Sequence, residues 1–590
     1  MDNIGRELQT FVEIDFPRCS RVYGVAPCTA SLSEGNPHKC FNSDKTCQDR
    51  ANLDLSEVQT FVYSINQSGL PKDRTIHPAL KSVTSNPIQL NLSGIDPKSS
   101  PLGKRARVVA EFEDFRDSDT GSDKYQAERR SGAAQFDGIG YDPFDQGHHF
   151  RKMRARFPYY LGNAFRIRRG YKGQPWDEMT VTNWVVSEWK GPDAGGRVQV
   201  TAKDILDLTD SKKAVAPKPS RGKLLLAIDK DATELTLTPS GIGATYADAG
   251  RVSIGREVMT FARDGDVMTL TARGVDGTQA GDHKALDVVQ QCLRYEFQEP
   301  QYVIRDLEEN FADVDPAFIP SDDWQASNGS WLAGIFLTRT IARPTGVSRL
   351  VSEILQLGIL HWWDEETQTL QYRPNRPLEP GEAFFDVTDA ANVIEGTGAL
   401  DMSESQRISQ LYFYHGQIDP TGPADSSSNY DKLALAFPDT NPYGQDAIKE
   451  IFNPWFGQLG DDAAAGVLAE RLVERYRDTP RLFSGILDVK DREGVKVASL
   501  LRVTTALAEN AIGGFEPQLM QANYVKREGD RIGFRAETFD IEGRFGFWLD
   551  DDVSVMDYDD ASDEEKDFGA YWMDDDVGEF PDGTGPYVYF

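Results

Sequence analysis

Residues 19–47 read CSRVYGVAPCTASLSEGNPHKCFNSDKTC and hold four of the chain's five cysteines. Cys19, Cys28, Cys40 and Cys47 are spaced C-x8-C-x11-C-x6-C. Four soft ligands in a short stretch with several Gly and Pro residues are typical of a site that binds metal through four thiolates. Basic residues outnumber acidic ones around them, and nearby cations lower the pKa of a thiol. The sequence therefore predicts these four cysteines as the metal-binding and cofactor-binding residues.

The spacing also bears on which group is bound. Zinc sites are usually built from C-x2–4-C knuckles, and the gaps of eight and six residues fit that pattern poorly. Wider gaps suit a larger iron–sulfur cube, so the preferred cofactor is a [4Fe-4S] cluster, with zinc as the alternative and disulfides or free thiols behind it. Cys292 stands in the apolar context VVQQCL and is predicted to be a small buried hydrophobe.

Length and charge bound the class of protein. The chain has 590 residues, which predicts roughly three to five domains. Its 94 acidic and 63 basic residues give a net charge of −31, opposite in sign to that of a nucleic-acid binder. Such charge indicates a solvated surface, or a wall past which DNA slides without sticking. No apolar run of about 18 residues is present, so we expect no membrane insertion, and the acidic start predicts no signal peptide.

Periodicity predicts a mainly β protein with minor α, in several domains. Amphipathic spacing predicts helices at 350–357, ending before Gly358, and at 463–476. Strands are predicted at 481–489 and 531–539, and a hairpin at 358–372. The expected segments are 1–60 with the cysteines, 61–215 as a β domain, 221–290 as an inserted β-barrel-like module, 291–540 as α+β domains including a second barrel, and 541–590 as an acidic, aromatic docking segment.

Two stretches of the first half stand out. Residues 114–142 are polar and Gly-rich and are predicted to be a long loop. Residues 151–169 are rich in bases and aromatics, and the alternation in FRIRRGY predicts a strand whose basic side faces acids of another subunit.

Motifs of catalysis are missing from the sequence. It contains no HExxH helix, no Gly-x-Ser-x-Gly elbow and no phosphate-binding loop. His148 and His149 form the one histidine pair, and we interpret them as solvent-exposed rather than metal-binding. The sequence thus predicts a protein that is not an enzyme.

Several segments resemble known proteins. The cysteine segment, with YGVAPC at 23–28 and KCFN at 39–42, resembles that of siphophage tail-tip and baseplate hub proteins, and its C-x8-C and C-x6-C halves are similar to those of the iron–sulfur tail-tip protein of lambda-like phages. The pattern of Arg273, Gly274, Gly277, Thr278, Ala280 and His283 resembles a module that recurs in phage tail proteins. LVSEI at 350–354, RISQLYFYHG at 407–416 and the ending at 557–583 look like hubs of phages and gene transfer agents.

This resemblance implies a structural hub with tail-tube-like β-barrel domains and a [4Fe-4S] cluster on the four cysteines. It implies a homotrimer at the distal end of a virion tail, assembled in the host cytoplasm. The implied partners are a distal tail protein hexamer, a central fibre or tip attachment protein and the C-terminus of the tape-measure protein, with phage DNA passing through the lumen unbound.

Two alternatives remain open at the level of sequence. An iron–sulfur redox enzyme would need a substrate or second cofactor motif beside the cysteines. A receptor-binding or glycan-binding tail protein would use exposed aromatics such as Trp362 and Trp363 to stack on sugars.

Overall fold

The computed structural model describes most of the chain and is mainly β with minor α, which confirms the predicted fold class. It falls into two compact units. The first is Met1–Pro87, Arg105–Ile205 and Trp363–Gln368, and the second is Ile88–Lys104, Leu206–Trp362 and Thr369–Phe590. The described residues are 7–66, 68–94, 100–328, 331–332, 334–376, 383–389, 391–437, 441–456, 462–488, 494–528 and 531–539, with short strands at 545–547, 571–572 and 588–589.

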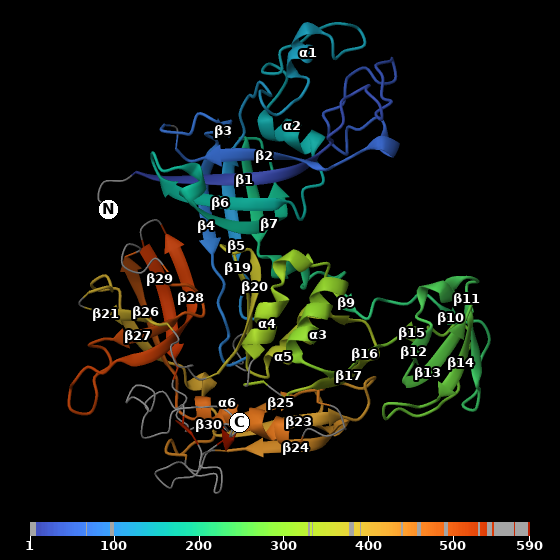
Figure 1. Ribbon diagram of the computed structural model, residues 1–590, viewed down its shortest axis with the longest axis vertical. Coiled ribbons are helices and arrows are strands. Elements are labelled where there is room, and N and C mark those ends of the chain that lie inside the picture. The colour runs from blue at the N-terminus through green and yellow to red at the C-terminus, as the bar shows by residue number, and fades with distance from the viewer. Residues whose placement is uncertain are drawn as a thin grey trace. The chain divides into compact units, whose positions relative to one another are not determined.

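The first unit is built on one eight-stranded sheet (Figure 1). In spatial order its strands are β3 (Ile76–His77), β2 (Glu57–Ser64), β1 (Leu8–Arg18), β6 (Ala164–Tyr171), β7 (Thr180–Lys190), β8 (Arg197–Lys203), β5 (Arg107–Glu113) and β4 (Leu80–Asn86). The edge strands β3 and β4 are consecutive in sequence and separated by two residues. Because so short a link cannot span a flat sheet of eight strands about 4.8 Å apart, the sheet curls until its edges approach each other.

The basic stretch at 151–169 divides between two elements. Helix α2 (His149–Arg156) takes its first part, and strand β6 takes the alternating FRIRRGY part. On β6, Arg166 binds Asp15 and Glu13, and Arg168 binds Glu13, with N–O distances of 2.6 to 2.9 Å. Both acids lie on β1, the neighbouring strand of the same unit. The expectation that these arginines face acids of another subunit is therefore wrong.

A small six-stranded barrel in the second unit spans residues 223–291. Its strands are β10 (Lys223–Leu224), β11 (Glu234–Thr238), β14 (Val267–Ala272), β13 (Glu257–Asp264), β12 (Ala249–Ile254) and β15 (Gln290–Gln291). Backbone bonds from Leu224 N to Asp287 O and from Val289 N to Gly222 O join its two ends. Its interior is filled by aliphatic and aromatic side chains that include Leu235, Val252 and Phe261.

One buried carboxylate organises the glycine-rich end of this barrel. Glu257 is 2% exposed and accepts hydrogen bonds from Arg273 Nε and Nη2 at 2.5 and 2.9 Å and from the backbone N–H groups of Gly274 and Gly281 at 3.1 and 3.0 Å. His283 Nε2 lies 2.8 Å from it. Gly274 has φ of +59°, and a Cβ there would lie 2.7 Å from a backbone nitrogen, which explains the glycine. The Arg-Gly…His pattern is thus a set of ligands for one carboxylate.

The rest of the second unit combines helices and two further sheets. A six-stranded sheet contains β21 (Phe385–Thr388), β27 (Leu500–Thr504), β28 (Gln518–Glu528), β29 (Arg531–Thr538), β26 (Arg481–Asp488) and β22 (Ala399–Met402). A three-stranded sheet contains β24 (Tyr430–Ala436), β23 (Gln410–Gln417) and β25 (Ile448–Phe452). The helices are α3 (Pro300–Asp306), α4 (Ser321–Asn328), α5 (Val347–Leu355) and α6 (Asp462–Tyr476).

The predicted hairpin is formed by β19 (Ile359–Asp364) and β20 (Thr369–Pro374). Its tip, Trp363–Gln368, belongs to the first unit, where Trp363 is 4% exposed and donates to the carbonyl of Asn183 at 3.0 Å. Trp363 is therefore core rather than a stacking platform for sugar.

Most of the predicted docking segment, 541–590, lies outside the described residues. The exceptions are β30 (Phe545–Phe547), β31 (Tyr571–Trp572) and β32 (Val588–Tyr589), which form a parallel three-stranded sheet. Within the described part of the chain, every helix is too short or too polar to cross a bilayer.

The Glu257 network yields a prediction about stability and pH. Burial alone would raise the pKa of Glu257, yet the bonds from Arg273, Gly281 and His283 lower it below its usual range. A lowered carboxyl pKa stabilises the fold above the unfolded pKa, about 4.3, and this contribution is lost as pH falls through the folded pKa. We expect Glu257→Gln to destabilise the barrel by about 3 kcal/mol at pH 7, because Arg273 loses its buried partner.

Hydrogen exchange of peptides from 223–291, corrected for intrinsic rates, measures this local effect. The exposed Glu234→Gln in the same barrel is the matched control and should exchange like the wild type. The difference in hydrogen-exchange rate between wild type and Glu257→Gln should become smaller below pH 4. A difference that stays constant down to pH 3 would contradict the ionic explanation.

Candidate metal centre

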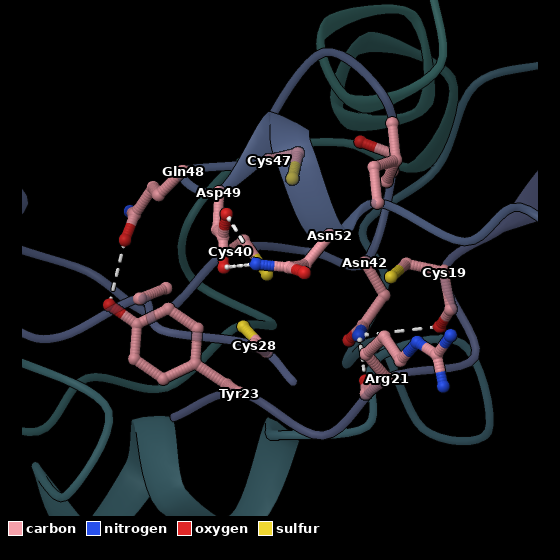
Figure 2. Close-up of a pocket in the computed structure, with 13 residues that line it drawn as sticks. Cys19, Arg21, Tyr23, Cys28, Cys40, Asn42, Cys47, Gln48, Asp49 and Asn52 are labelled. Atoms are coloured by element: carbon pink, nitrogen blue, oxygen red, sulfur yellow. Dashed lines mark hydrogen bonds between the residues drawn. The ribbon is translucent and has the colours of Figure 1, made fainter. Parts of the chain in front are cut away.

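The four cysteines lie in the connection between two paired strands of the first unit. Strand β1 ends at Arg18, β2 begins at Glu57, and these two residues are register partners. All four cysteines line one hollow of about 340 Å³ that is partly open to solvent. Figure 2 shows their sulfur atoms facing this shared space. The structure therefore brings together the four residues that the sequence singled out.

The distances between the sulfur atoms restrict which metal group the hollow can hold. All five cysteines are free thiols, so the disulfide alternative is not seen. Within the described part of the chain, no three of these sulfurs lie mutually within 4.8 Å. A single tetrahedral zinc ion, with Zn–S bonds of about 2.3 Å, would need its sulfurs roughly 3.8 Å apart. As arranged, the four thiols surround a space wider than a one-ion site.

Arg129 braces the cysteine segment from the side. It lies in helix α1 (Gln126–Ser131), its side chain is 0% exposed, and its Nε binds Asp123 at 2.6 Å. Its Nη1 and Nη2 atoms donate to the carbonyls of Lys39 and Cys40 at 3.1 and 3.0 Å. Leaving a buried guanidinium without its hydrogen-bond acceptors costs free energy. The bonds from Arg129 to the two carbonyls therefore fix the backbone at Cys40.

Cation–π contacts add to this brace. The guanidinium of Arg129 lies 3.8 Å from the ring centre of Phe41, and that of Arg156 in α2 lies 4.0 Å from it. Phe41 follows Cys40 directly in the chain. Arg129 therefore contacts both the Cys40 carbonyl and the ring of the next residue, and Arg156 adds a second cation at that ring.

Further contacts fix the backbone near the other cysteines. Lys124 Nζ donates to the carbonyl of Cys19 at 3.1 Å, and the N–H of Tyr23 donates to the hydroxyl of Tyr125 at 2.7 Å. Backbone bonds join Lys39 N to Ala134 O and Phe136 N to Pro37 O. Residues 123–136 thus hold the cysteine segment from outside.

The sequence assigned this stretch to a loop and missed the role of Arg129 and Tyr125, because no local pattern reveals contacts about 90 residues away.

Local hydrogen bonds shape the far end of the segment. The Asp49 carboxylate accepts from Thr29 N at 2.7 Å and from Asn52 Nδ2 at 3.0 Å, and these bonds, the Thr29 N–H first, lower the pKa of Asp49. The backbone N–H of Cys47 donates to Asp44 O at 3.3 Å.

Burial first, and the neighbouring thiols after it, raise the pKa of Cys40 and Cys47. Burial raises the pKa of Cys40, with further contributions from Cys47, Cys28 and Cys19. Burial also raises the pKa of Cys47, with contributions from Cys19 and Cys28. The expectation that neighbouring bases lower these pKa values is therefore wrong for Cys40 and Cys47. A cationic centre among the four sulfurs would favour the thiolate forms of Cys40 and Cys47, so the set is a suitable donor set for a metal group.

The structure agrees with the prediction for Cys292 and disagrees with the one for His149. Cys292 is 9% exposed, and burial raises the pKa of its thiol to about 12, as expected of a small buried hydrophobe. His149 is 2% exposed, so the interpretation of the His148–His149 pair as solvent-exposed is wrong for this residue.

Comparisons with known proteins give distant structural likenesses. No family model and no curated protein matches the chain. A 43 kDa tail protein of prophage MuSo2 from Shewanella oneidensis is similar at a TM-score of 0.33 and 10% identity, covering 78% of this chain and 92% of its own. A tail protein from Neisseria meningitidis MC58 matches at 0.32 and 10%, covering 64% and 89%. A chain of a native gene transfer agent virion matches at 0.29 and 11%, covering 56% and 91%.

The brace predicts a contrast between adjacent arginines. We expect Arg129→Met to free the carbonyls of Lys39 and Cys40 and to leave Asp123 buried and unpaired, a loss of about 3 to 5 kcal/mol. Limited proteolysis, read by mass spectrometry, should then cut within residues 19–50. Arg130→Met is the matched control, since Arg130 is 53% exposed and binds Asp142 at the surface. Equal cleavage of both variants would contradict the role given to Arg129.

Proposed function

We propose that this chain is a structural hub protein of the tail tip or baseplate of a long-tailed phage or a gene-transfer-agent-like particle. In this proposal, Cys19, Cys28, Cys40 and Cys47 bind a [4Fe-4S] cluster that holds the cysteine segment in shape. The observation that carries the proposal is the convergence of all four cysteines on one hollow within a connection of the curled eight-stranded sheet.

The spacing of the sulfurs favours a cluster over zinc. The sulfurs are too far apart for one tetrahedral ion, whereas the iron atoms of a cluster occupy the middle of such a space and each takes one thiolate. When bound, the cluster would supply four metal–sulfur bonds at points that are 8, 11 and 6 residues apart in the chain.

The burial pattern favours a staple over a reaction centre. Few side chains in the cysteine segment are buried, and the small apolar cluster there consists of Tyr23, Ala30, Tyr125 and Ala134 with half-buried neighbours. A segment with so little core gains its folding free energy from metal binding. A redox enzyme would instead need a substrate site beside the cluster, and the hollow is lined mainly by the thiols and by polar groups already engaged with the backbone, such as Asn42 and Asp49.

The hub role rests on the β architecture and the charge. The chain supplies an eight-stranded curled sheet and a second, six-stranded sheet, which suit two tube-like domains per chain. Three chains would then form a ring of pseudo-sixfold symmetry between a hexameric distal tail protein and a central fibre, with the tape-measure C-terminus at its lumen. A net charge of −31 lets DNA pass such a lumen without binding.

Only one of the two tryptophans proposed to stack on a sugar is accessible. Trp363 is buried and hydrogen-bonded, which leaves the half-buried Trp362 without its expected partner for stacking on a sugar. The receptor-binding reading therefore has less support than the hub.

Metal analysis after anaerobic purification tests the cluster. We expect about four iron and four sulfide per chain with a broad absorbance near 400 nm, and loss of most iron in Cys28→Ser and Cys40→Ser. Cys292→Ser is the matched control and should keep its iron. A colourless, zinc-loaded wild type would refute the cluster and leave the hub proposal standing.

Composition of the particle tests the hub. We expect mass spectrometry to find the chain in purified virions, and cryo-electron microscopy of the tail to place three copies at its distal end. Finding the chain in infected-cell lysate and never in purified virions would refute the hub.

A further inference from the structure

A second group of ligand-type side chains lies in the first unit, apart from the cysteines. His77 of β3, Asp117 beyond the end of β5 and His149 at the start of α2 each offer one ligand atom, and these atoms lie within 4.8 Å of one another. Within the described part of the chain, this is the one set of three or more His, Cys, Asp or Glu residues that meets so closely. Asp117 and His149 are buried, and His77 is half-buried.

Hydrogen-bond partners hold both ring nitrogens of His149. Its Nδ1 lies 2.6 Å from Asp117 Oδ2, and its Nε2 lies 2.9 Å from the Tyr63 hydroxyl. That hydroxyl also donates to the sulfur of Met153 at 3.2 Å, so with a metal ion at Nδ1 the Nε2–H group finds an acceptor in the Tyr63 oxygen. In the absence of a metal ion, a proton is shared between Nδ1 and the Asp117 carboxylate, which are 2.6 Å apart.

A ring held at both nitrogens suits a metal site. A ligating histidine commonly donates its other N–H to a fixed acceptor, here Tyr63, which orients the ring. The ring centre of His77 lies 4.7 Å from that of His149, and a neutral imidazole there offers one nitrogen lone pair. The three residues thus offer two imidazole nitrogens and one carboxylate oxygen.

The charges nearby leave Asp117 available to a cation. Lys152 and Arg156 of α2 each bind Asp119 at 2.8 Å, so Asp119 engages both bases. The Asp117 Oδ1 atom accepts from the backbone N–H of Asp119 at 3.1 Å, which orients the carboxylate. A hollow lined by Asp117 and His149, partly open to solvent, lies beside these two residues.

We propose that His77, Asp117 and His149 bind a divalent first-row metal ion, with zinc as the representative ion. Two histidines and a carboxylate with an open position are a donor set for such ions. Binding moves the proton between Nδ1 and Oδ2 to solvent and separates these atoms from 2.6 Å to roughly 3.3 Å, the spacing around a tetrahedral zinc ion.

The position of the site gives the ion a structural role. His77 lies on the edge strand β3, and Asp117 follows β5, which pairs with the opposite edge strand β4. An ion held by both residues ties the two edges of the curled sheet together, where the described strands form no β3–β4 ladder.

Zinc titration of the full chain tests this proposal independently of the cluster. We expect the wild type to bind one zinc ion through nitrogen and oxygen, read by X-ray absorption at the zinc edge, and to melt at a higher temperature with zinc. His77→Gln should weaken zinc binding more than tenfold. His148→Gln removes the adjacent imidazole, which is not in the ligand set, and should bind like the wild type.

Two outcomes would overturn the site. Zinc bound only through sulfur would assign it to the cysteines, and equal affinity of wild type and His77→Gln would exclude His77 as a ligand. Should His77→Gln fail to fold, Tyr63→Phe keeps all three ligands and removes the acceptor for His149 Nε2–H. It should weaken zinc binding about 10- to 100-fold, and an unchanged affinity there would also overturn the proposal.

Discussion

The pairing of Arg18 with Glu57 is the constraint on which the cysteine segment depends. These residues are the last register partners of β1 and β2, so residues 19–56 leave and re-enter the sheet at one point. The chain between them must fold on its own, with the entropy of a long closed loop against it. Lys124 reinforces this point, since its amine binds both the carbonyl of Cys19 and the carboxylate of Glu57.

Two kinds of interaction offset that entropy. Arg129, paired with Asp123 and hydrogen-bonded to two carbonyls, acts without metal and fixes one position near Cys40. In the proposed cluster the thiols would act on the whole segment, and a cation among them would favour the thiolates of Cys40 and Cys47, whose pKa burial and the other thiols raise. The brace therefore orders part of the segment by itself, and under the proposed function this would lower the conformational entropy that cluster binding has to overcome.

The sequence predicted what local patterns encode. The spacing of Leu350, Ile354 and Leu357 located helix α5, and Gly358, with φ of +83°, lies just past it as predicted. Strands β26 and β29 lie at the predicted positions, because alternation reports a half-buried strand directly. The convergence of the four cysteines followed from their shared chemistry and short separation.

What the sequence did not predict depends on partners far along the chain. Arg166 and Arg168 find their acids on β1, about 150 residues away, so a basic strand looked like an interface. His149 packs among aromatic rings while Asp117 and Tyr63 satisfy both of its nitrogens, and a flanking glycine suggested exposure instead. Arg129 sits in a polar stretch without periodicity, and only its buried acid and the carbonyls of residues 39 and 40 explain it.

The distant contacts of Arg129 and His149 lie near two places where the backbone ladders of the sheet end. Backbone ladders stabilise the eight-stranded sheet from β3 through β4, but they stop at the connection between β1 and β2 and at the seam between β3 and β4. At the connection the sequence places four thiols, and at the seam it places His77, Asp117 and His149. Where backbone hydrogen bonds end, a curled sheet needs side chains to hold its shape, and in both places those side chains are of types that bind metal ions. The same need accounts for Asp123, Arg129 and Arg156, which hold Phe41 and its neighbours beside the hollow that leads to His149.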